Sequence, residues 1–210
     1  LVRSRGLGDV YKRQILYYLN PLKTYGKEDI NMAKLVFRKS GKVIENPEEI
    51  KSFLEKYGVI YDRWGIDRLD EEVRKNYDID EENQRIIIEA YKPELEELKQ
   101  KMGYITEDIV VLSDKTPNLD ALMEKFKREH HHIDDEVRFV VDGSGIFPVK
   151  IEDDIVDIHV EAGELIVVPA GARHWFELDE NRKIKCIRVF KTPAGWEAIY
   201  NENEKATMGS

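Results

Sequence analysis

The sequence predicts a mainly β protein, a small antiparallel barrel with helices packed around it. Two observations predict this class. From residue 130 onward, short runs rich in Val, Ile and Phe alternate with turn residues, which is typical of antiparallel sheets. Before residue 130, apolar residues recur mostly at helical spacing. We therefore expect a single domain over residues 32–210, with a helix-rich part at 32–128 and a barrel core at about 105–200.

The composition narrows the function classes. The chain has 210 residues, 33 Lys and Arg against 42 Asp and Glu, and a net charge of -9, so we expect no nucleic-acid partner. A single cysteine, Cys186, cannot form an internal disulfide, and this favours a reducing, cytoplasmic location. No apolar run approaches the roughly 20 residues of a membrane-spanning helix. An acidic surface without an obvious exposed apolar helix favours a monomer.

The first 31 residues differ from the rest. They show no clear pattern, and residues 1–14 resemble a translated cloning adaptor. Met32, in contrast, opens a well-patterned strand. We expect residues 1–31 to be a non-native extension, with a genuine but disordered extension as the alternative.

The helix-rich part begins with a strand at 33–38 and a turn at Ser40-Gly41. A helix follows, for which Asn46 is the expected N-cap, Pro47 the first residue, and Gly58 the residue that closes it in a left-handed conformation. Helical spacing continues over 81–90 and 93–102, and a strand is expected at 106–112. Thr116 and Pro117 open a last helix before the barrel.

Seven strands are expected in the barrel, separated by tight turns such as Asp142-Gly143. Their ranges are 137–141, 146–151, 155–160, 164–168, 174–178, 184–190 and 196–200.

The most informative segment is 129–138, which reads Glu-His-His-His-Ile-Asp-Asp-Glu-Val-Arg. If it forms one strand, His130, His132, Glu136 and Arg138 share a face, while His131 points the other way. Imidazoles with one carboxylate suit a first-row transition metal, and the absence of thiolates disfavours structural zinc.

A fourth ligand has to come from elsewhere in the chain, and His174 lies on a separate predicted strand. Three histidines and one carboxylate would leave two positions of an octahedron open for a substrate, which favours catalysis. The alternative is that the histidine run is a tag fragment or a solvated loop. Asp134 and Asp135 are expected to form a turn or to accept hydrogen bonds around the ligands.

These residues resemble the two cupin motifs. The first is His130-x-His132-x-x-x-Glu136 followed by Gly143, and the second is Gly163 followed by Pro169-x-Gly171-x-x-His174. Glu124 and Leu178 depart from the general pattern at positions that affect turn geometry rather than metal ligation. The cupin fold, a double-stranded β-helix or jelly-roll-like barrel, is therefore the expected architecture.

Within the cupins, the chain resembles the acireductone dioxygenase family from about residue 32 to 200. The segments that carry the resemblance are 129–138, Pro-Ala-Gly-Ala-Arg-His-Trp-Phe at 169–176 and Pro-Ala-Gly-Trp at 193–196. The resemblance implies an oxidoreductase of methionine salvage that cleaves 1,2-dihydroxy-3-keto-5-methylthiopentene with O2. It also implies one Fe(2+) or Ni(2+) per chain. The iron form would yield 2-keto-4-methylthiobutyrate and formate, and the nickel form methylthiopropionate, CO and formate.

Further site residues follow from this resemblance. Arg138 would stabilise the enediolate charge, which its position beside Glu136 also supports. Arg188, within an apolar run, is a second catalytic candidate, with a plain ion pair as the alternative. Phe176 and Trp196 would shape the substrate pocket, unless they are ordinary core aromatics.

Two other function classes stay open at this point. One is a non-catalytic metal-binding cupin, and the other is a different cupin dioxygenase or an isomerase. Arg138 distinguishes the first, because a domain that only binds metal needs no anion-binding side chain beside it.

Overall fold

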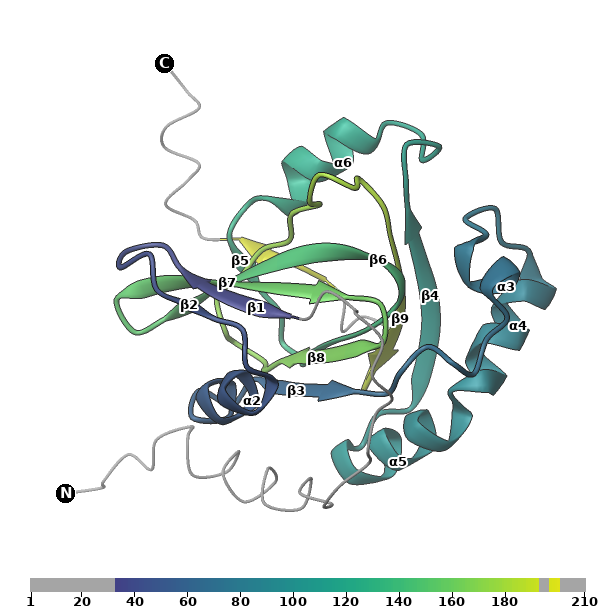
Figure 1. The fold of residues 1–210 in the computed structure, drawn as a ribbon, viewed down its shortest axis with the longest axis horizontal. Helices are drawn as coiled ribbons and strands as arrows, with labels where there is room; N and C mark the ends of the chain where they lie inside the picture. Colours follow the sequence, from purple (N-terminus) through teal and green to yellow (C-terminus); the bar gives the residue numbers. More distant parts are fainter. Residues whose placement is uncertain (1–32, 193–196, 201–210) are drawn as a thin grey trace.

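The computed structural model describes residues 33–192 and 197–200, and all statements below concern these residues. Antiparallel strands curl into a barrel, helices α4 and α5 lie along one side next to β4 and β9, and α6 lies at one end (Figure 1). The strands are β1 (Lys34–Phe37), β2 (Val43–Ile44), β3 (Ile60–Arg63), β4 (Thr106–Leu112), β5 (His130–His131), β6 (Glu136–Ile151), β7 (Asp154–Glu161), β8 (Glu164–Val168), β9 (Ile184–Phe190) and β10 (Ile199–Tyr200). The helices are α2 (Pro47–Glu55), α3 (Glu71–Lys75), α4 (Glu81–Ala90), α5 (Lys92–Met102) and α6 (Leu119–Phe126).

Strand β6 organises the main sheet. The sheet order is β2-β1-β7-β6-β8-β3, while β9 pairs with both β6 and β4, and β10 pairs separately with β5. The first half of β6 pairs with β8 and β9, and its second half pairs with β7. The predicted class, a mainly β protein with peripheral helices, is confirmed.

The predicted boundaries hold well for α2, α4 and α5, whereas α6 begins at Leu119 and not at Thr116-Pro117. Asn46 caps α2 by accepting from the backbone N–H groups of Glu48 and Glu49, and Pro47 is the first helical residue. Gly58 adopts the expected left-handed conformation, with φ +78°. The short elements β2, β3 and α3 were not predicted.

The barrel strands differ from the prediction at three places. Strand β6 runs through Asp142-Gly143 without a turn, so the predicted separate strands 137–141 and 146–151 are wrong. The register of β6 against β9 shifts between Val140 and Asp142, so a bulge lies directly before Asp142-Gly143. Segment 174–178 forms only isolated bridges, His174 to His130 and Val149, and Glu177 to Ile146. The strand predicted at 196–200 is shorter, at Ile199–Tyr200, and its residue 196 lies outside the described part.

Gly143 lies just after the bulge in β6, in a left-handed conformation. Its φ is +80°, and a Cβ at this position would overlap the Lys183 carbonyl oxygen and the Tyr77 hydroxyl. We expect Gly143→Ala to lower the free energy of unfolding by about 2–3 kcal/mol through crowding and backbone strain. Gly41 also has a positive φ but no atom within 4 Å of a built Cβ, so Gly41→Ala should cost only about 1 kcal/mol. Urea unfolding of both variants measures the difference, and equal costs would contradict the role of crowding.

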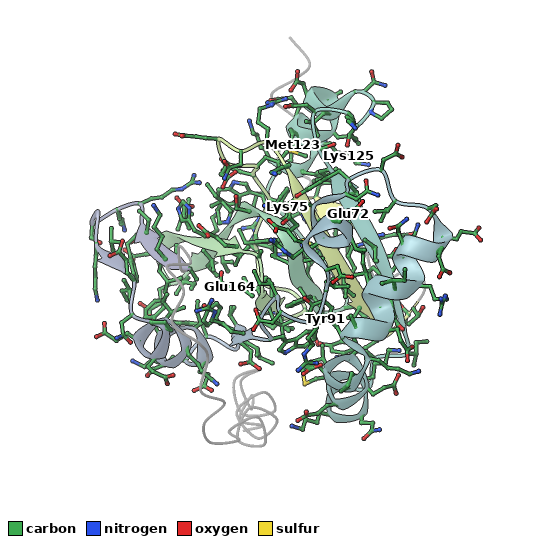
Figure 2. All side chains as sticks on the ribbon, turned by 45° about the vertical axis from the view of Figure 1, so that its right-hand side comes forward. Glu72, Lys75, Tyr91, Met123, Lys125 and Glu164 are labelled. Carbon is green, nitrogen blue, oxygen red and sulfur yellow. The ribbon has the colours of Figure 1, made fainter. Side chains whose placement is uncertain are left out.

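Two hydrophobic clusters lie on opposite faces of the sheet. Residues such as Val140, Ile166 and Cys186 face the barrel interior, so Cys186 is the core residue that the sequence indicates. The alternate residues of the same strands contact α4 and α5, where the Tyr91 ring lies 4.4 Å from that of Phe139. Figure 2 shows Tyr91 where these helices meet the sheet. Glu136 and Arg138 belong by alternation to the interior face.

None of the described helices combines the length and the apolar character that a bilayer-spanning helix needs.

Candidate metal centre

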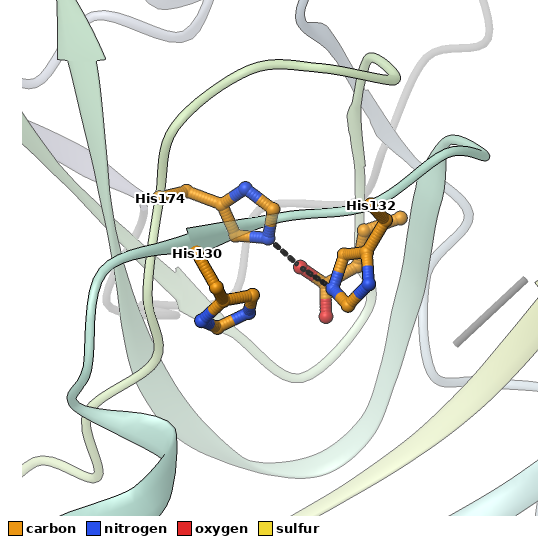
Figure 3. Close-up of side chains that lie close together, drawn as sticks. His130, His132 and His174 are labelled. Carbon is orange, nitrogen blue, oxygen red and sulfur yellow. Dashed lines mark ion pairs between the residues drawn. The ribbon is translucent and has the colours of Figure 1, made fainter. Parts of the chain in front are cut away.

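Three histidines and one glutamate lie close together, and Figure 3 shows the three imidazole rings side by side. His130 lies on β5, His132 follows it, Glu136 begins β6, and His174 lies in the segment after β8. One possible ligand atom from each residue lies within 4.8 Å of those of the other three. All three histidines are buried. The structure therefore brings together the four residues that the sequence predicts as metal ligands.

The local path of the chain differs from the one used to predict this cluster. Strand β5 ends at His131, the chain bends over residues 132–135, and β6 begins at Glu136. His132 therefore reaches the site from a bend and not from a continuous strand. His131 is paired with Ile199 of β10 and is not part of the cluster.

Backbone pairing places His174 beside His130. The N–H of each residue donates to the carbonyl of the other, both at 3.0 Å. The turn before His174 contacts the other ligands, because Gly171 N donates to the His132 carbonyl at 3.0 Å. Two segments separated by about forty residues in the sequence are thereby joined around the centre.

The tautomer of each histidine follows from its backbone partner. Nδ1 of His130 lies 2.7 Å from the Arg128 carbonyl, Nδ1 of His132 lies 2.9 Å from the Glu197 carbonyl, and Nδ1 of His174 lies 2.8 Å from the Ala172 carbonyl. A carbonyl only accepts, so each Nδ1 carries the proton and each neutral ring keeps its lone pair on Nε2. Such backbone partners are typical of histidines that bind metals.

The donor atoms of the three histidines and Glu136 suit a bound cation. Nε2 of His174 and Oε2 of Glu136 are buried and form a close contact, and neither atom has a hydrogen-bond partner among the described residues. In the neutral tautomer both atoms present lone pairs to each other. A positive ion or a proton between them is what satisfies such a pair. Three imidazoles with one carboxylate form a donor set suited to a first-row divalent metal.

The protonation of the histidines affects this fit. Burial lowers the pKa of His130 to about 4 and also lowers the pKa of His132. Burial acts in the same direction on His174, but the facing Glu136 carboxylate outweighs it and raises the pKa of His174 above its usual value. His174 is therefore the ligand at which a proton competes first with a metal.

We expect metal content to fall as the pH drops below about 6, because an imidazolium cannot bind a metal. The direction of this effect follows from His174. Because its pKa is raised, its protonated form appears at a higher pH than that of an ordinary histidine. Dialysis at stepwise lower pH followed by elemental analysis measures this. Full metal content at pH 4 would contradict the ligand set.

Arg138 lies directly beside the four residues. Its Nη2 is 2.5 Å from Oε1 of Glu136, and its Nη1 donates to the Val137 carbonyl at 2.9 Å. The contact leaves Oε2 of Glu136 facing His174. Arg138 thus holds the carboxylate in place and puts a permanent positive charge at the edge of the site.

The other predicted site residues have different surroundings. Arg188 forms an ion pair with Asp108 of β4, as in the alternative interpretation of this residue. The Phe176 ring packs against Phe147, with 5.1 Å between centroids, at the margin of the interior cluster. Trp196 lies outside the described residues.

Sequence reasoning did not distinguish Asp135 from its neighbour Asp134. The Asp135 carboxylate is buried and accepts from Tyr104 Oη at 2.9 Å, Lys191 Nζ at 2.8 Å and Ala170 N at 3.0 Å. It joins the bend between the ligands to three distant parts of the chain. Its position immediately before Glu136 was the available signal, but its partners lie too far away in the sequence to be predicted.

The barrel and the site together define a metal-binding protein of the cupin class. The sequence model of the ARD/ARD' family matches residues 34–198. The acireductone dioxygenase of Sulfurihydrogenibium sp. (strain YO3AOP1) is 88% identical over 84% of this chain and 99% of its own length. The acireductone dioxygenase of Bacillus subtilis (strain 168) is 45% identical over 76% of this chain and 90% of its own.

A solved structure agrees with these relatives. Acireductone dioxygenase from Bacillus anthracis, with a cadmium ion in its active centre, is 40% identical, covers 81% of this chain and 99% of its own, and superposes with a TM-score of 0.79. The chain belongs to the ARD/ARD' family, the acireductone dioxygenases. The predicted cupin fold, the family resemblance and the enzyme class are confirmed.

Proposed function

We propose that the protein binds one Fe(2+) or Ni(2+) per chain through His130, His132, Glu136 and His174. The substrate would be 1,2-dihydroxy-3-keto-5-methylthiopentene, cleaved with O2. The observation that carries this proposal is the pair of facing, unsatisfied buried atoms on His174 and Glu136. Support also comes from the Bacillus anthracis relative, whose active centre holds a cadmium ion.

A bound divalent ion would supply Lewis-acid polarisation and a template for two substrate oxygens. The protein's own residues would orient the ligands, bind the substrate and exclude water. The backbone carbonyls of Arg128, Glu197 and Ala172 hold the three rings with Nε2 toward the centre. Arg138 holds Glu136 and presents a cation that donates hydrogen bonds to the enediolate oxygens. The buried surroundings keep bulk water from the reacting carbons.

We further propose a role in methionine salvage with two product sets. The iron-loaded protein would yield 2-keto-4-methylthiobutyrate and formate, and the nickel-loaded protein methylthiopropionate, CO and formate. Because affinity for such a site rises from iron to nickel, occupancy in the cell would follow metal supply. Phe176 and Trp196 would contact the thioether tail of the substrate.

The test is reconstitution. Protein stripped of metal is reloaded separately with Fe(2+) and with Ni(2+), mixed with the acireductone under O2, and analysed for oxygen uptake, CO and keto acid. We expect oxygen uptake with both metals and CO only with nickel. A loaded protein that consumes no oxygen would support a non-catalytic metal-binding cupin. A preference for bulky catechol-like substrates, or isomerisation without oxygen uptake, would support another cupin enzyme.

The remaining proposals concern the location, oligomeric state, partners and domain organisation of the enzyme. We propose a cytoplasmic monomer with no nucleic-acid or membrane partner, in agreement with the net charge of -9 and the single buried cysteine. We also keep the proposal of one domain over residues 32–210. Sedimentation of the purified chain would test the monomer, and a mass near twice 24.6 kDa would contradict it.

A further inference from the structure

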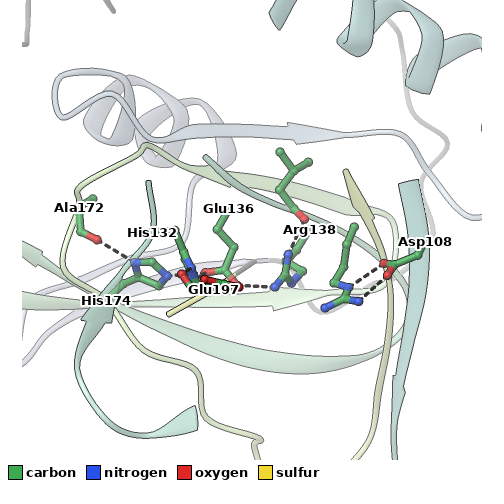
Figure 4. Close-up of polar contacts among 9 residues, drawn as sticks. Asp108, His132, Glu136, Arg138, Ala172, His174 and Glu197 are labelled. Atoms are coloured by element: carbon green, nitrogen blue, oxygen red, sulfur yellow. Dashed lines mark hydrogen bonds and ion pairs between the residues drawn. The ribbon is translucent and has the colours of Figure 1, made fainter. Parts of the chain in front are cut away.

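A row of three charged side chains crosses the strands next to the metal centre. Arg138 of β6 lies opposite Arg188 of β9, and Arg188 lies opposite Asp108 of β4. Residues opposite each other in register project on the same face of a sheet, so the three side chains share the interior face with Glu136. Figure 4 follows this row from His174 through Glu136 and Arg138 to Asp108.

Two arginines in directly opposite positions repel each other, which is unfavourable for a sheet. Each has a carboxylate partner in this structure. Arg138 contacts Glu136. Arg188 forms a two-bond pair with Asp108, at 2.7 Å from Nε to Oδ1 and 2.5 Å from Nη2 to Oδ2.

Stability alone is a weak reason for the second pair. The Asp108 side chain is 46% exposed and that of Arg188 is 24% exposed, so solvent screens the pair and limits what it adds to the free energy of unfolding. The two-bond geometry does restrict the plane and the direction of the Arg188 guanidinium. Its contribution is therefore to orientation.

The formal charges around the site, with a divalent ion included, sum to a positive value, which favours an anionic substrate. A divalent ion with two arginines would bring four positive charges, and Glu136 with Asp108 brings two negative charges. Two positive charges then remain, which matches a substrate bound as an enediolate dianion. The Asp108 carboxylate supplies one of the two negative charges in this sum. Its pairing with Arg188 leaves the guanidinium group in the row of charged side chains.

We propose that Asp108 is a positioning residue, which holds Arg188 beside Arg138 so that both guanidinium groups face an anionic substrate at the metal. This inference rests on the proposed function of the site. The opposite behaviour would be competition, in which Asp108 occupies Arg188 and weakens substrate binding. The two possibilities predict opposite changes in KM when the carboxylate is removed.

Steady-state oxygen uptake by the nickel-loaded protein tests the proposal. We expect Asp108→Asn to raise KM by about tenfold with little change in kcat, and Asp108→Glu to restore most of the loss. Metal content and thermal midpoint should stay unchanged. In an Arg188→Met background, Asp108→Asn should have no further effect, because the carboxylate acts through Arg188.

Asp114→Asn is the matched control, since Asp114 is also an exposed aspartate paired with an arginine, Arg182, at 3.0 Å. It should leave KM unchanged. A KM that falls in Asp108→Asn, or that stays the same, would overturn the proposal.

A second readout does not need turnover. Oxalate is a small dianion with two oxygens available to a metal, and its binding to the nickel-loaded protein can be measured by calorimetry. We expect Asp108→Asn to weaken oxalate binding by about tenfold and Asp114→Asn to leave it unchanged. Unchanged oxalate binding in Asp108→Asn would overturn the inference about Asp108. Absence of wild-type turnover together with the expected oxalate result would overturn the proposed function alone.

Discussion

Replacing His132 with alanine is expected to lower metal affinity more than about 100-fold and to abolish oxygen uptake, with the fold retained. Loss of a residue that only orients a ligand commonly costs 10- to 100-fold, so loss of a ligand should cost more. The Nε2 of His132 faces the centre, since its Nδ1 is held by the Glu197 carbonyl. Elemental analysis, isothermal titration with Ni(2+) and circular dichroism together measure the effect.

The neighbouring histidine provides a matched control. His131 is next in the same triplet but pairs with Ile199 and is not part of the cluster. His131→Ala should therefore keep full metal content and near-normal turnover. Equal metal loss in the two variants would contradict the role of His132 as a ligand. It would mean that both substitutions act by disturbing the local fold.

The second large effect concerns stability. Lys185 is fully buried, and its Nζ donates to the carbonyls of Val73 at 3.3 Å and Arg74 at 2.7 Å and also to that of Asn76. These carbonyls lie at the C-terminal end of α3, where a helix lacks internal donors. Lys185→Met would keep the volume and leave the carbonyls without this donor. We expect a loss of about 4 kcal/mol in the free energy of unfolding and a midpoint lower by roughly 10 °C.

Lys150→Met serves as the control for this variant. Lys150 is 40% exposed and pairs with Glu129 at 2.8 Å, so its replacement should cost less than about 1 kcal/mol. Thermal and urea unfolding of both proteins provide the comparison. A cost for Lys185→Met as small as that for Lys150→Met would mean that water replaces the ammonium group.

The sequence predicts the metal cluster better than the path of the chain through it. His130, His132 and Glu136 are close in sequence, so any compact path brings them near one another, and both a strand and a bend satisfy their spacing. His174 was accessible only through the second motif, because its pairing with His130 joins distant segments. Local spacing carries no information about such a pairing.

The errors in the barrel have a physical cause. Asp-Gly usually indicates a hairpin turn. Here the Asp142 carboxylate is held by Arg74 and Tyr77, and Gly143, in a left-handed conformation, stays paired within β6 just after a bulge. Arg74 and Tyr77 lie some 65 residues earlier, in and after a helix that the pattern did not reveal. The partners of Asp135, Arg188 and Lys185 were missed for the same reason.

The pairing of β10 with β5 also bears on how the metal centre is assembled during folding. The ring of Tyr200 lies 5.8 Å from that of His130, and the Glu197 carbonyl holds His132. A nascent chain that ends before residue 197 has the four ligand residues but lacks the acceptor that sets the tautomer of one of them. The centre therefore depends on residues 197–200 as well as on its four ligands, because these residues supply the acceptor for His132 and the strand that pairs with β5.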